Sequence, residues 1–377
     1  MSERAVLIGL VMKGRHSSEA ALDELARLAC AAGATPVLSM LQERRRPDPA
    51  MFFGRGKVEQ LAKACSECEA DVVIVDAELS PVQRRNLEAS LARRVVDRTQ
   101  LILGIFARRA RTREGKLQVE LAQLRYLLPM LVGAGDGLSR PGGGIGTLGP
   151  GETKLETDRR RIRRRLSTLR RHIDQVRKRR SQLRARRAKL AVPTVALVGY
   201  TNAGKTTLFN QLTGGGGAAS NAVFVTLDPL VRRLRLRNRR MVLCTDTVGF
   251  LERLPHTLVA AFRATLEEVA EADLLLHVCD ASSQFRDRNV EAVRQVLSDI
   301  GADEVPCVTI WNKSDLIARE ERRRLRLRDP EAICLSALDE TSAPIVLRLI
   351  ETWLGRRAID RGHGESVKSV RLAAGAA

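Results

Sequence analysis

The sequence predicts an α/β protein with a small N-terminal α/β domain, a basic antiparallel helical hairpin with a glycine-rich tip loop, and a C-terminal doubly wound nucleotide-binding domain. Two observations predict this fold class. Apolar, strand-like runs alternate with helical patterns near the N-terminus and again after Pro193. Between these regions, leucines recur at coiled-coil spacing on both sides of a glycine-rich segment. We expect domains at 1–112, 113–192 and 193–356, with the tip loop at 133–151 and a flexible tail at 357–377.

The first domain reads as a mainly parallel sheet, with strands expected at 5–12, 35–41, 71–76 and 95–97 and helices at 17–33, 57–65 and 80–94. Ahead of the second helix lie Gly54, Arg55, Gly56 and Lys57. This stretch is either a plain turn or a cradle for an anion, such as the phosphates of ATP, at a helix start. The sequence leaves both interpretations open.

The helical hairpin carries most of the formal charge of +20. From Glu152 to Leu190 there are seventeen Lys and Arg against four Asp and Glu, a net +13. A composition bias of the genome would spread arginine evenly, so this concentration favours a polyanionic partner such as structured RNA. The residues expected to touch it are Arg140 in the tip loop and Arg159, Arg160, Arg161, Arg163, Arg164 and Arg165 on the second helix.

Cysteine use and hydropathy predict a cytoplasmic protein, and we expect it to be a monomer when free. The seven cysteines are an odd number among apolar neighbours, which is typical of buried thiols in a reducing compartment. Cys65 and Cys68 form a CxxC pair without a second ligand pair nearby, so we expect no zinc site. The sequence shows neither a secretory signal nor an apolar run of membrane-spanning length.

A phosphate-binding loop is expected between the strand at 194–199 and the helix at 205–212. In this context, main-chain N–H groups and the helix dipole hold nucleotide phosphates. Lys205 would reach between the β- and γ-phosphates, and the Thr206 hydroxyl would bind Mg²⁺. The predicted contacts are Gly199, Tyr200, Thr201, Asn202, Ala203, Gly204, Lys205, Thr206 and Thr207.

Two further segments are expected to read the γ-phosphate. The strand at 239–247 closes with Asp246, Thr247, Val248 and Gly249, where the aspartate would hold Mg²⁺ through water and the glycine N–H would meet the γ-phosphate. Thr226 has the spacing of a second magnesium hydroxyl, on a loop that orders with triphosphate. Its predicted contact segment is Phe224, Val225, Thr226, Leu227 and Asp228. Catalysis is assigned to Lys205, Thr226 and Gly249.

Guanine is the predicted base. Asn312, Lys313, Ser314 and Asp315 follow an apolar strand, and a carboxylate there accepts from both N1–H and the 2-amino group of guanine, which adenine lacks. Asn312 and Lys313 would support the pocket, while main-chain N–H groups of Ser336, Ala337 and Leu338 would meet the guanine oxygen. Together, the motifs predict GTP hydrolysis.

Phe250 occupies the position where Ras-like switches carry the glutamine that orients water. Because an apolar ring does not polarise water, we expect slow intrinsic hydrolysis that a partner or an added cation must raise. Asn202 either holds K⁺ near the phosphates or braces the loop. His256, a lone histidine in the switch region, is expected at the surface rather than in catalysis.

These motifs resemble the HflX family of ribosome-associated GTPases over roughly residues 5–355. The stretches that carry the resemblance include GRGKVEQL, LSPVQRRNLE, GPGETKLETDRRRIR, GYTNAGKTTLFN and LPHTLVAAFRATLEE. The resemblance implies binding to the large ribosomal subunit, with the basic hairpin directed at the peptidyl-transferase region, and splitting or rescue of stalled ribosomes under stress. Gly104, Leu148 and the glycine run from Gly214 to Gly217 depart from the family pattern. The alternative is an RNA-binding ribosome assembly factor in which nucleotide only sets conformation.

Overall fold

The computed structural model of the chain describes residues 2–12, 18–131, 150–189, 192–215, 224, 228–251, 266 and 268–355. These residues fall into two compact units, each described by itself below. The first unit runs to Arg180 and includes Phe224, and the second takes the rest from Ser181 onward. The predicted tip loop and tail lie outside the described residues.

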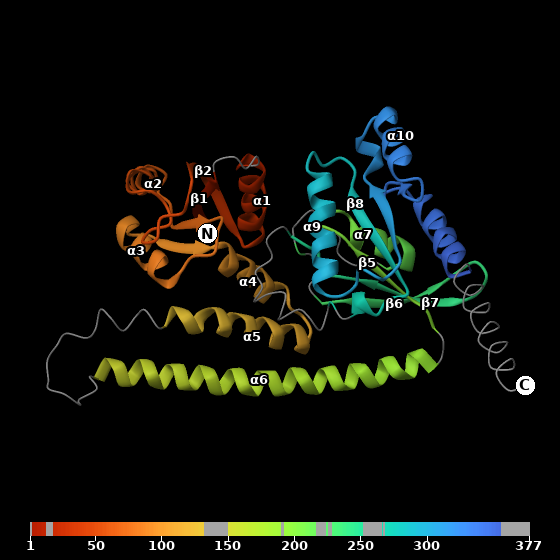
Figure 1. Cartoon of the computed structure of the whole chain (residues 1–377), viewed down its shortest axis with the longest axis horizontal. Coiled ribbons are helices and arrows are strands. Elements are labelled where there is room, and N and C mark those ends of the chain that lie inside the picture. Colours follow the sequence, from red (N-terminus) through yellow and green to blue (C-terminus); the bar gives the residue numbers. More distant parts are fainter. Residues whose placement is uncertain are drawn as a thin grey trace, which may run out of the picture. The chain divides into compact units, whose positions relative to one another are not determined.

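The first unit contains a four-stranded parallel sheet in the order β2-β1-β3-β4 (Figure 1). Its strands are β1 (Glu3–Met12), β2 (Ala34–Arg44), β3 (Val72–Val75) and β4 (Arg94–Asp97), and its helices are α1 (Ser18–Ala31), α2 (Arg55–Glu67), α3 (Pro81–Leu91) and α4 (Arg98–Arg109). Val73, Val75 and Val95 face a core built with α2 and α3. The alternate residues Val72, Ile74 and Val96 are buried too. Burial on both faces explains why these strands read as continuous apolar runs.

Two helices follow, α5 (Arg113–Met130) and the 40-residue α6 (Pro150–Lys189), and the first unit takes in all of α5 and α6 as far as Arg180. They run antiparallel, side by side (Figure 1). The leucine spacing found in the sequence forms their contact, a cluster of Leu117, Leu121, Leu124, Leu128, Ile162, Leu166, Leu169 and Ile173. The predicted helical hairpin is therefore confirmed by its packing. Outside the cluster α6 presents charge, and Arg160, Arg161 and Arg164 are exposed.

The second unit is built on a six-stranded sheet in the order β10-β9-β8-β5-β7-β6. Only β6 is antiparallel to its neighbour. The strands are β5 (Thr194–Val198), β6 (Leu230–Arg235), β7 (Met241–Asp246), β8 (Leu274–Asp280), β9 (Cys307–Asn312) and β10 (Ile333–Cys334). The helices are α7 (Lys205–Thr213), α9 (Arg286–Asp299), α10 (Arg319–Arg328), the short 3₁₀ turn η1 (Ser314–Leu316) and a helix at 342–355. The parallel strands bring the ends of β5, β7, β8 and β9 to one edge, which positions the site.

Three elements were not expected from the sequence. Helix α4 has a glycine at its centre, Gly104, which lowers helix propensity. Strand β6 and helix α10 are both rich in arginine and bury little, so their periodicity is weak. The stretch LVAAFRATLEEVA at 258–270, whose pattern predicts a helix, lies mostly outside the described residues. The α/β fold class itself is confirmed.

Candidate functional site

The phosphate loop is a tight turn that only glycine accommodates at its two ends. Gly199 has φ +151° and Gly204 has φ +95°. A Cβ at Gly199 would lie 2.2 Å from the carbonyl oxygen of Val278, and one at Gly204 would lie 2.1 Å from Nδ2 of Asn312. The main chain thus approaches its neighbours too closely for a side chain. Gly204 then caps α7, whose first N–H groups face the loop.

Lys205 begins α7 and is only 6% exposed. Its ammonium donates to the carbonyl oxygens of Gly199 (3.0 Å) and Tyr200 (2.8 Å), across the mouth of the loop. Burial lowers the pKa of Lys205 to about 8, while the nearby carboxylate of Asp246 acts in the opposite direction. A bound phosphate would supply a second anion and stabilise the charged form.

Thr206 and Asp246 come together although forty residues separate them. The Thr206 hydroxyl donates to Oδ2 of Asp246 at 2.8 Å, and Asp246 ends β7 with no exposed surface. A hydroxyl and a carboxylate are hard oxygen donors of the kind that Mg²⁺ prefers. The pair therefore fits a magnesium site at the start of α7.

Gly249 follows at the same edge of the sheet. A Cβ here would lie 2.8 Å from Cγ2 and 2.9 Å from Cα of Thr201, and 3.1 Å from Nζ of Lys205. The Gly249 backbone is thus pressed against the phosphate loop and its lysine. Thr247 lies between Asp246 and Gly249 in the sequence. Its side chain turns away from the phosphate loop, because its hydroxyl donates to the carbonyl oxygen of Leu197.

Phe250 is locked into the core beside the loop. Its N–H donates to the carbonyl oxygen of Gly199 (3.0 Å), and its carbonyl oxygen accepts from the N–H of Thr201 (2.8 Å). The residue is 1% exposed. The ring at the usual glutamine position is thus internal to the fold and does not face solvent.

The base-recognition segment is tied to the phosphate loop through Asn312. Its Nδ2 donates to the carbonyl oxygen of Ala203 (2.7 Å), and its Oδ1 accepts from the N–H of Ala337 (2.7 Å). Lys313 pairs with Asp280 at 2.6 Å. Asp315 sits in η1 with an exposed side chain, where a ligand can reach it.

The Ser336–Leu338 segment differs from the expectation in one detail. The N–H of Ala337 is already bonded to Asn312, and the N–H of Leu338 approaches the hydroxyl of Ser336 (3.4 Å). The contact between the main-chain N–H groups of this segment and the guanine oxygen stays a prediction. The nucleotide contacts of Asn202, Thr207 and Val248 also stay predictions. Asn202 has φ +59° and is half-buried in the loop.

Several predicted site residues lie outside the described part of the chain: Val225, Thr226, Leu227, Arg140 and His256. Of the segment around Thr226, Phe224 is buried and Asp228 is partly exposed. The second magnesium hydroxyl and the tip-loop contact are therefore untested by the geometry.

On the basic helix, the predicted contacts Arg159, Arg163 and Arg165 make ion pairs. Arg159 and Arg163 approach Glu156, and Arg165 reaches Glu120 of α5 at 2.7 Å. These pairs are exposed and hold weakly, so they can exchange for a phosphate.

The glycine-containing stretch ahead of α2 gains no ligand partner in the structure. The N–H of Gly54, which caps α2, is bonded to Oε1 of Gln42 at 2.9 Å. A helix start alone does not define an anion site, so the ATP cradle stays a prediction. Cys65 is buried and unpaired, and within the described residues no cluster of metal-ligating side chains occurs.

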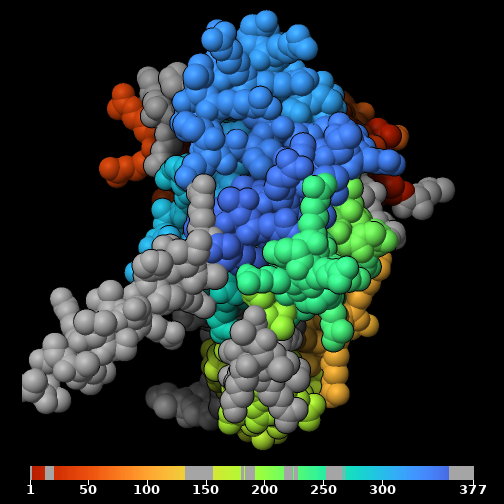
Figure 2. All heavy atoms as spheres, turned by 90° about the vertical axis from the view of Figure 1, so that its right-hand side faces the viewer, coloured from red at the N-terminus to blue at the C-terminus, as the bar shows by residue number. Residues whose placement is uncertain are grey.

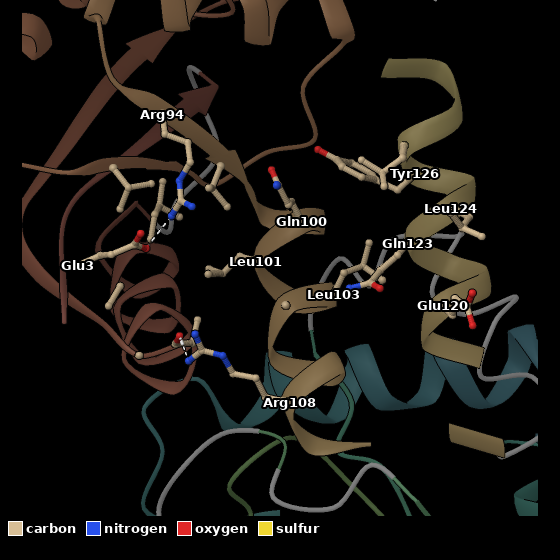
Figure 3. Close-up of a pocket in the computed structure, with 18 residues that line it drawn as sticks. Glu3, Arg94, Gln100, Leu101, Leu103, Arg108, Glu120, Gln123, Leu124 and Tyr126 are labelled. Atoms are coloured by element: carbon tan, nitrogen blue, oxygen red, sulfur yellow. Dashed lines mark hydrogen bonds and ion pairs between the residues drawn. The ribbon is translucent and has the colours of Figure 1, made fainter. Parts of the chain in front are cut away.

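Sequence reasoning missed two features of the first unit. Arg98, 5% exposed, is buried between Asp76 and Glu24, with its Nη1 2.6 Å from Oδ1 of Asp76. A cavity of about 600 Å³ lies between the sheet, α4 and α5. Figure 3 shows Arg94 paired with Glu3 on one side, α4 in the middle and the side chains of α5 on the other. No motif in the sequence marks a cavity, since its lining comes from five separate segments.

Fold and geometry define a P-loop GTPase: a doubly wound sheet, a lysine-bearing glycine loop, a buried strand-end aspartate and an asparagine that joins both halves. Family models match three consecutive segments, described as GTP-binding GTPase N-terminal (19–107), GTP-binding GTPase middle region (109–187) and 50S ribosome-binding GTPase (194–313). The chain belongs to the HflX family of GTPases.

Curated relatives support this membership. The chain is 50% identical over 315 residues to GTPase HflX of Caldanaerobacter subterraneus subsp. tengcongensis, covering 84% of this chain and 73% of the relative. It is 46% identical over 344 residues to GTPase HflX of Escherichia coli, covering 91% and 80%. A solved structure of a protein called SsGBP with GDP has 24% identity, a TM-score of 0.51, and coverage of 93% and 98%, which supports the fold. Among the described residues, no helix has the length and apolar character needed to span a bilayer.

Proposed function

We propose that the chain is a GTP-driven switch that binds the large ribosomal subunit through its basic helix, splits or rescues stalled ribosomes under stress, and hydrolyses GTP faster on the ribosome. One observation carries this proposal. A phosphate loop and a base-recognition segment stand in the same chain as helix α6, on which Arg160, Arg161, Arg163 and Arg164 are exposed, and the segment from Glu152 to Leu190 carries a formal +13. Such a surface gains affinity from each phosphate it neutralises. The family model described as 50S ribosome-binding supports the partner.

The phosphate end of the site would work by charge and position. The loop N–H groups and α7 would hold the α- and β-phosphates, while Lys205 would exchange its two carbonyl acceptors for phosphate oxygens. Gly249, pressed against Lys205, would place its N–H at the γ-phosphate. The Thr206 hydroxyl and, through water, Asp246 would hold Mg²⁺, with Thr226 as the second hydroxyl. When bound, that ion would neutralise charge between the β- and γ-phosphates.

Selectivity for guanine would rest on Asp315. Its carboxylate would accept from N1–H and the 2-amino group, while Asn312 and Lys313 would keep the segment in place through their bonds to Ala203 and Asp280. The exposed carboxylate has no comparable pair of donors in adenine. GTP is therefore the expected substrate.

The buried Phe250 ring argues that hydrolysis is slow in the free protein. The missing polarising group would come from the ribosome or from K⁺ held near Asn202. The same observation favours a second candidate function, a ribosome assembly factor in which nucleotide sets conformation and hydrolysis is incidental.

Turnover measured with and without purified large subunits separates the two. On the first proposal, subunits raise the GTPase rate by a factor of at least about 100, in line with the contribution of one well-placed stabilising group. An unchanged rate would reject the stimulated enzyme and leave the assembly factor. Repeating the assay in Na⁺ and in K⁺ tests Asn202, and Asn202→Ala should remove any difference between the two ions.

Cosedimentation with separated subunits tests the binding partner. We expect binding to the large subunit that is stronger with a non-hydrolysable GTP analogue than with GDP. Replacing Arg160, Arg161, Arg163 and Arg164 together with glutamine should weaken binding and flatten its salt dependence without changing GTP affinity. An unchanged salt slope would mean that this helix face is only solvated.

A further inference from the structure

A second basic surface stands in the GTPase unit, far along the sequence from the helical hairpin. Strands β6 and β7 form an antiparallel hairpin with Arg235 opposite Met241, closed by a turn in which the N–H of Leu236 donates to the carbonyl oxygen of Arg240. We call residues 230–241 the arginine hairpin. Figure 2 faces it, as the bright green ridge of atoms that projects toward the viewer.

The arginine hairpin has one buried row and one exposed row. Leu234 and Leu236 are 4% and 3% exposed and anchor β6 in the core. Arg232 is held as well, because its guanidinium stacks 5.7 Å from the centre of the Phe209 ring. The remaining arginines all project into solvent: Arg233, Arg235, Arg237, Arg239 and Arg240. The fold thus holds the arginine hairpin in place and leaves five guanidinium groups available.

These five groups are not ion-paired within the described part of the chain, although the Glu351 carboxylate reaches the turn and accepts from the N–H of Asn238 (3.0 Å). No acidic residue occurs between Pro229 and Thr245, and none of the five forms an ion pair with any described residue. Elsewhere in the same unit, arginines do find partners, as Arg328 does with Asp287 at 2.6 Å. Like charges this close repel, so the arrangement costs stability in the absence of a partner.

The distribution of charge singles out the same place. The segment from Pro229 to Thr245 carries +6 and the segment from Glu152 to Leu190 carries +13, which leaves +1 of the formal +20 for the rest of the chain. A general excess of arginine would not divide in this way. The two segments share one chemical property, attraction to a dense anion.

The chemistry of the arginine hairpin favours the phosphate backbone of a structured RNA as its binding partner. Guanidinium groups match phosphate oxygens in a bidentate manner. The segment contains no aromatic residue, so it offers no platform on which unpaired bases would stack. The narrow major groove of an RNA duplex hides base edges from side chains, which leaves phosphates and 2′-hydroxyl groups as the contacts.

We propose that the arginine hairpin is a second RNA-binding surface, which grips the phosphate backbone of duplex ribosomal RNA independently of the helical hairpin. This inference rests on the proposed ribosomal function for the identity of the RNA. The hairpin also exposes the apolar side chains of Leu230, Val231 and Met241, which makes an anionic membrane the principal competing target. A third role for the arginines is to keep an open sheet edge from pairing.

The test compares two triple variants of the full chain. The first is Arg233→Gln, Arg235→Gln and Arg237→Gln, all exposed and outside the nucleotide site. The matched control is Arg319→Gln, Arg323→Gln and Arg326→Gln on α10, which removes the same charge from exposed positions of the same unit. Binding to a labelled RNA duplex of mixed sequence, and to purified large subunits, is measured across a KCl series.

We expect the hairpin variant to bind the duplex roughly tenfold more weakly near ~0.1 M salt, with a salt slope smaller by about 2 to 3. The control should stay within about twofold of the wild type, and GTP affinity and thermal unfolding should not change in either variant. Equal weakening in both variants, or an unchanged slope in the hairpin variant, would overturn the proposal. So would hairpin-dependent binding to vesicles containing anionic lipid without any effect on RNA.

The same measurements decide the proposed ribosomal function and the role of the arginine hairpin separately. If large subunits fail to bind the wild type, the ribosomal function falls while the duplex measurement still decides the hairpin. If subunits bind and only the helical-hairpin variant weakens, the ribosomal function stands and the arginine hairpin is rejected as an RNA contact.

Discussion

Nδ2 of Asn312 donates a 2.7 Å hydrogen bond to the carbonyl oxygen of Ala203, which joins the end of strand β9 to the phosphate loop. The base half and the phosphate half of the site are therefore one connected structure. Removing this side chain leaves the Ala203 carbonyl and the Ala337 N–H buried without their partner. We expect Asn312→Ala to lower the free energy of unfolding by about 2–4 kcal/mol and to weaken GDP as well as GTP. Asn289→Ala, on the surface helix α9, is the control.

Gly204 lies on the phosphate-loop side of the same contact with Asn312, so a substitution there tests the contact again. A Cβ at Gly204 would meet Nδ2 of Asn312 at 2.1 Å, so Gly204→Ala should destabilise the fold and cut nucleotide affinity. In the Asn312→Ala background the steric part of this effect disappears, and only the cost of the +95° φ angle remains, about 1–2 kcal/mol. A double-mutant cycle by denaturant unfolding measures the difference. Additive effects would show that the two residues do not meet.

Gly104→Ala, whose Cβ meets nothing within 4 Å, should instead stabilise its helix.

Asp315→Asn addresses base choice. The asparagine amide would donate a hydrogen bond toward a group of guanine that is itself a donor. Xanthine carries a carbonyl group at that place, and this group can accept the bond. GTP affinity should fall by at least about 100-fold while XTP affinity rises, measured by competition against a fluorescent GDP analogue. Retained GTP selectivity would contradict the role assigned to the exposed carboxylate. Asp303→Asn, a substitution of the same kind on a loop of the same unit, should leave both affinities unchanged.

Gly249→Ala separates triphosphate from diphosphate. The new methyl group would lie within 2.9 Å of Thr201 and 3.1 Å of the Lys205 ammonium, so the backbone must move away from the γ-phosphate position. We expect turnover to fall by about 100-fold, with a smaller loss of GDP affinity. Equal losses for GTP and GDP, measured by equilibrium binding of a non-hydrolysable GTP analogue and of GDP, would place the effect on the fold rather than on the γ-phosphate.

His277 predicts how stability depends on pH. This residue of β8 is 3% exposed, and burial, with help from Arg294 and Lys205, lowers its pKa to about 4. The unfolded chain takes up a proton near pH 6.5 that the folded chain refuses until about pH 4, so the free energy of unfolding falls as the pH drops through that window. The loss at pH 4 is about 3 kcal/mol. Urea unfolding at several pH values should show a flatter profile for His277→Gln than for the wild type.

The sequence predicted where the candidate site residues stand in the fold, but not how they are connected. Gly204, Lys205, Asp246 and Asp315 lie at strand ends or in short loops, and the apolar runs that mark those strands are visible in the sequence itself. The bonds that connect them are not local. Asn312 and Ala203 are 109 residues apart, and nothing in either segment specifies that they meet.

Charge misled the prediction where it was buried or repeated. Arg98 reads as a surface residue, yet Asp76 and Glu24, distant in sequence, let the fold enclose it. Repeated arginines hid β6 and α10, because side chains such as Arg233 and Arg323 face solvent and leave little apolar periodicity. The leucine seam of the helical hairpin was predictable, since each helix shows its spacing on its own.

The paired main-chain bonds between Phe250 and the phosphate loop have a mechanical consequence. Because the N–H of Phe250 binds Gly199 and its carbonyl oxygen binds Thr201, the residue moves as one piece with the loop that holds the phosphates. Any change in the phosphate loop is therefore passed directly to the main chain at Phe250, whatever side chain stands at that position.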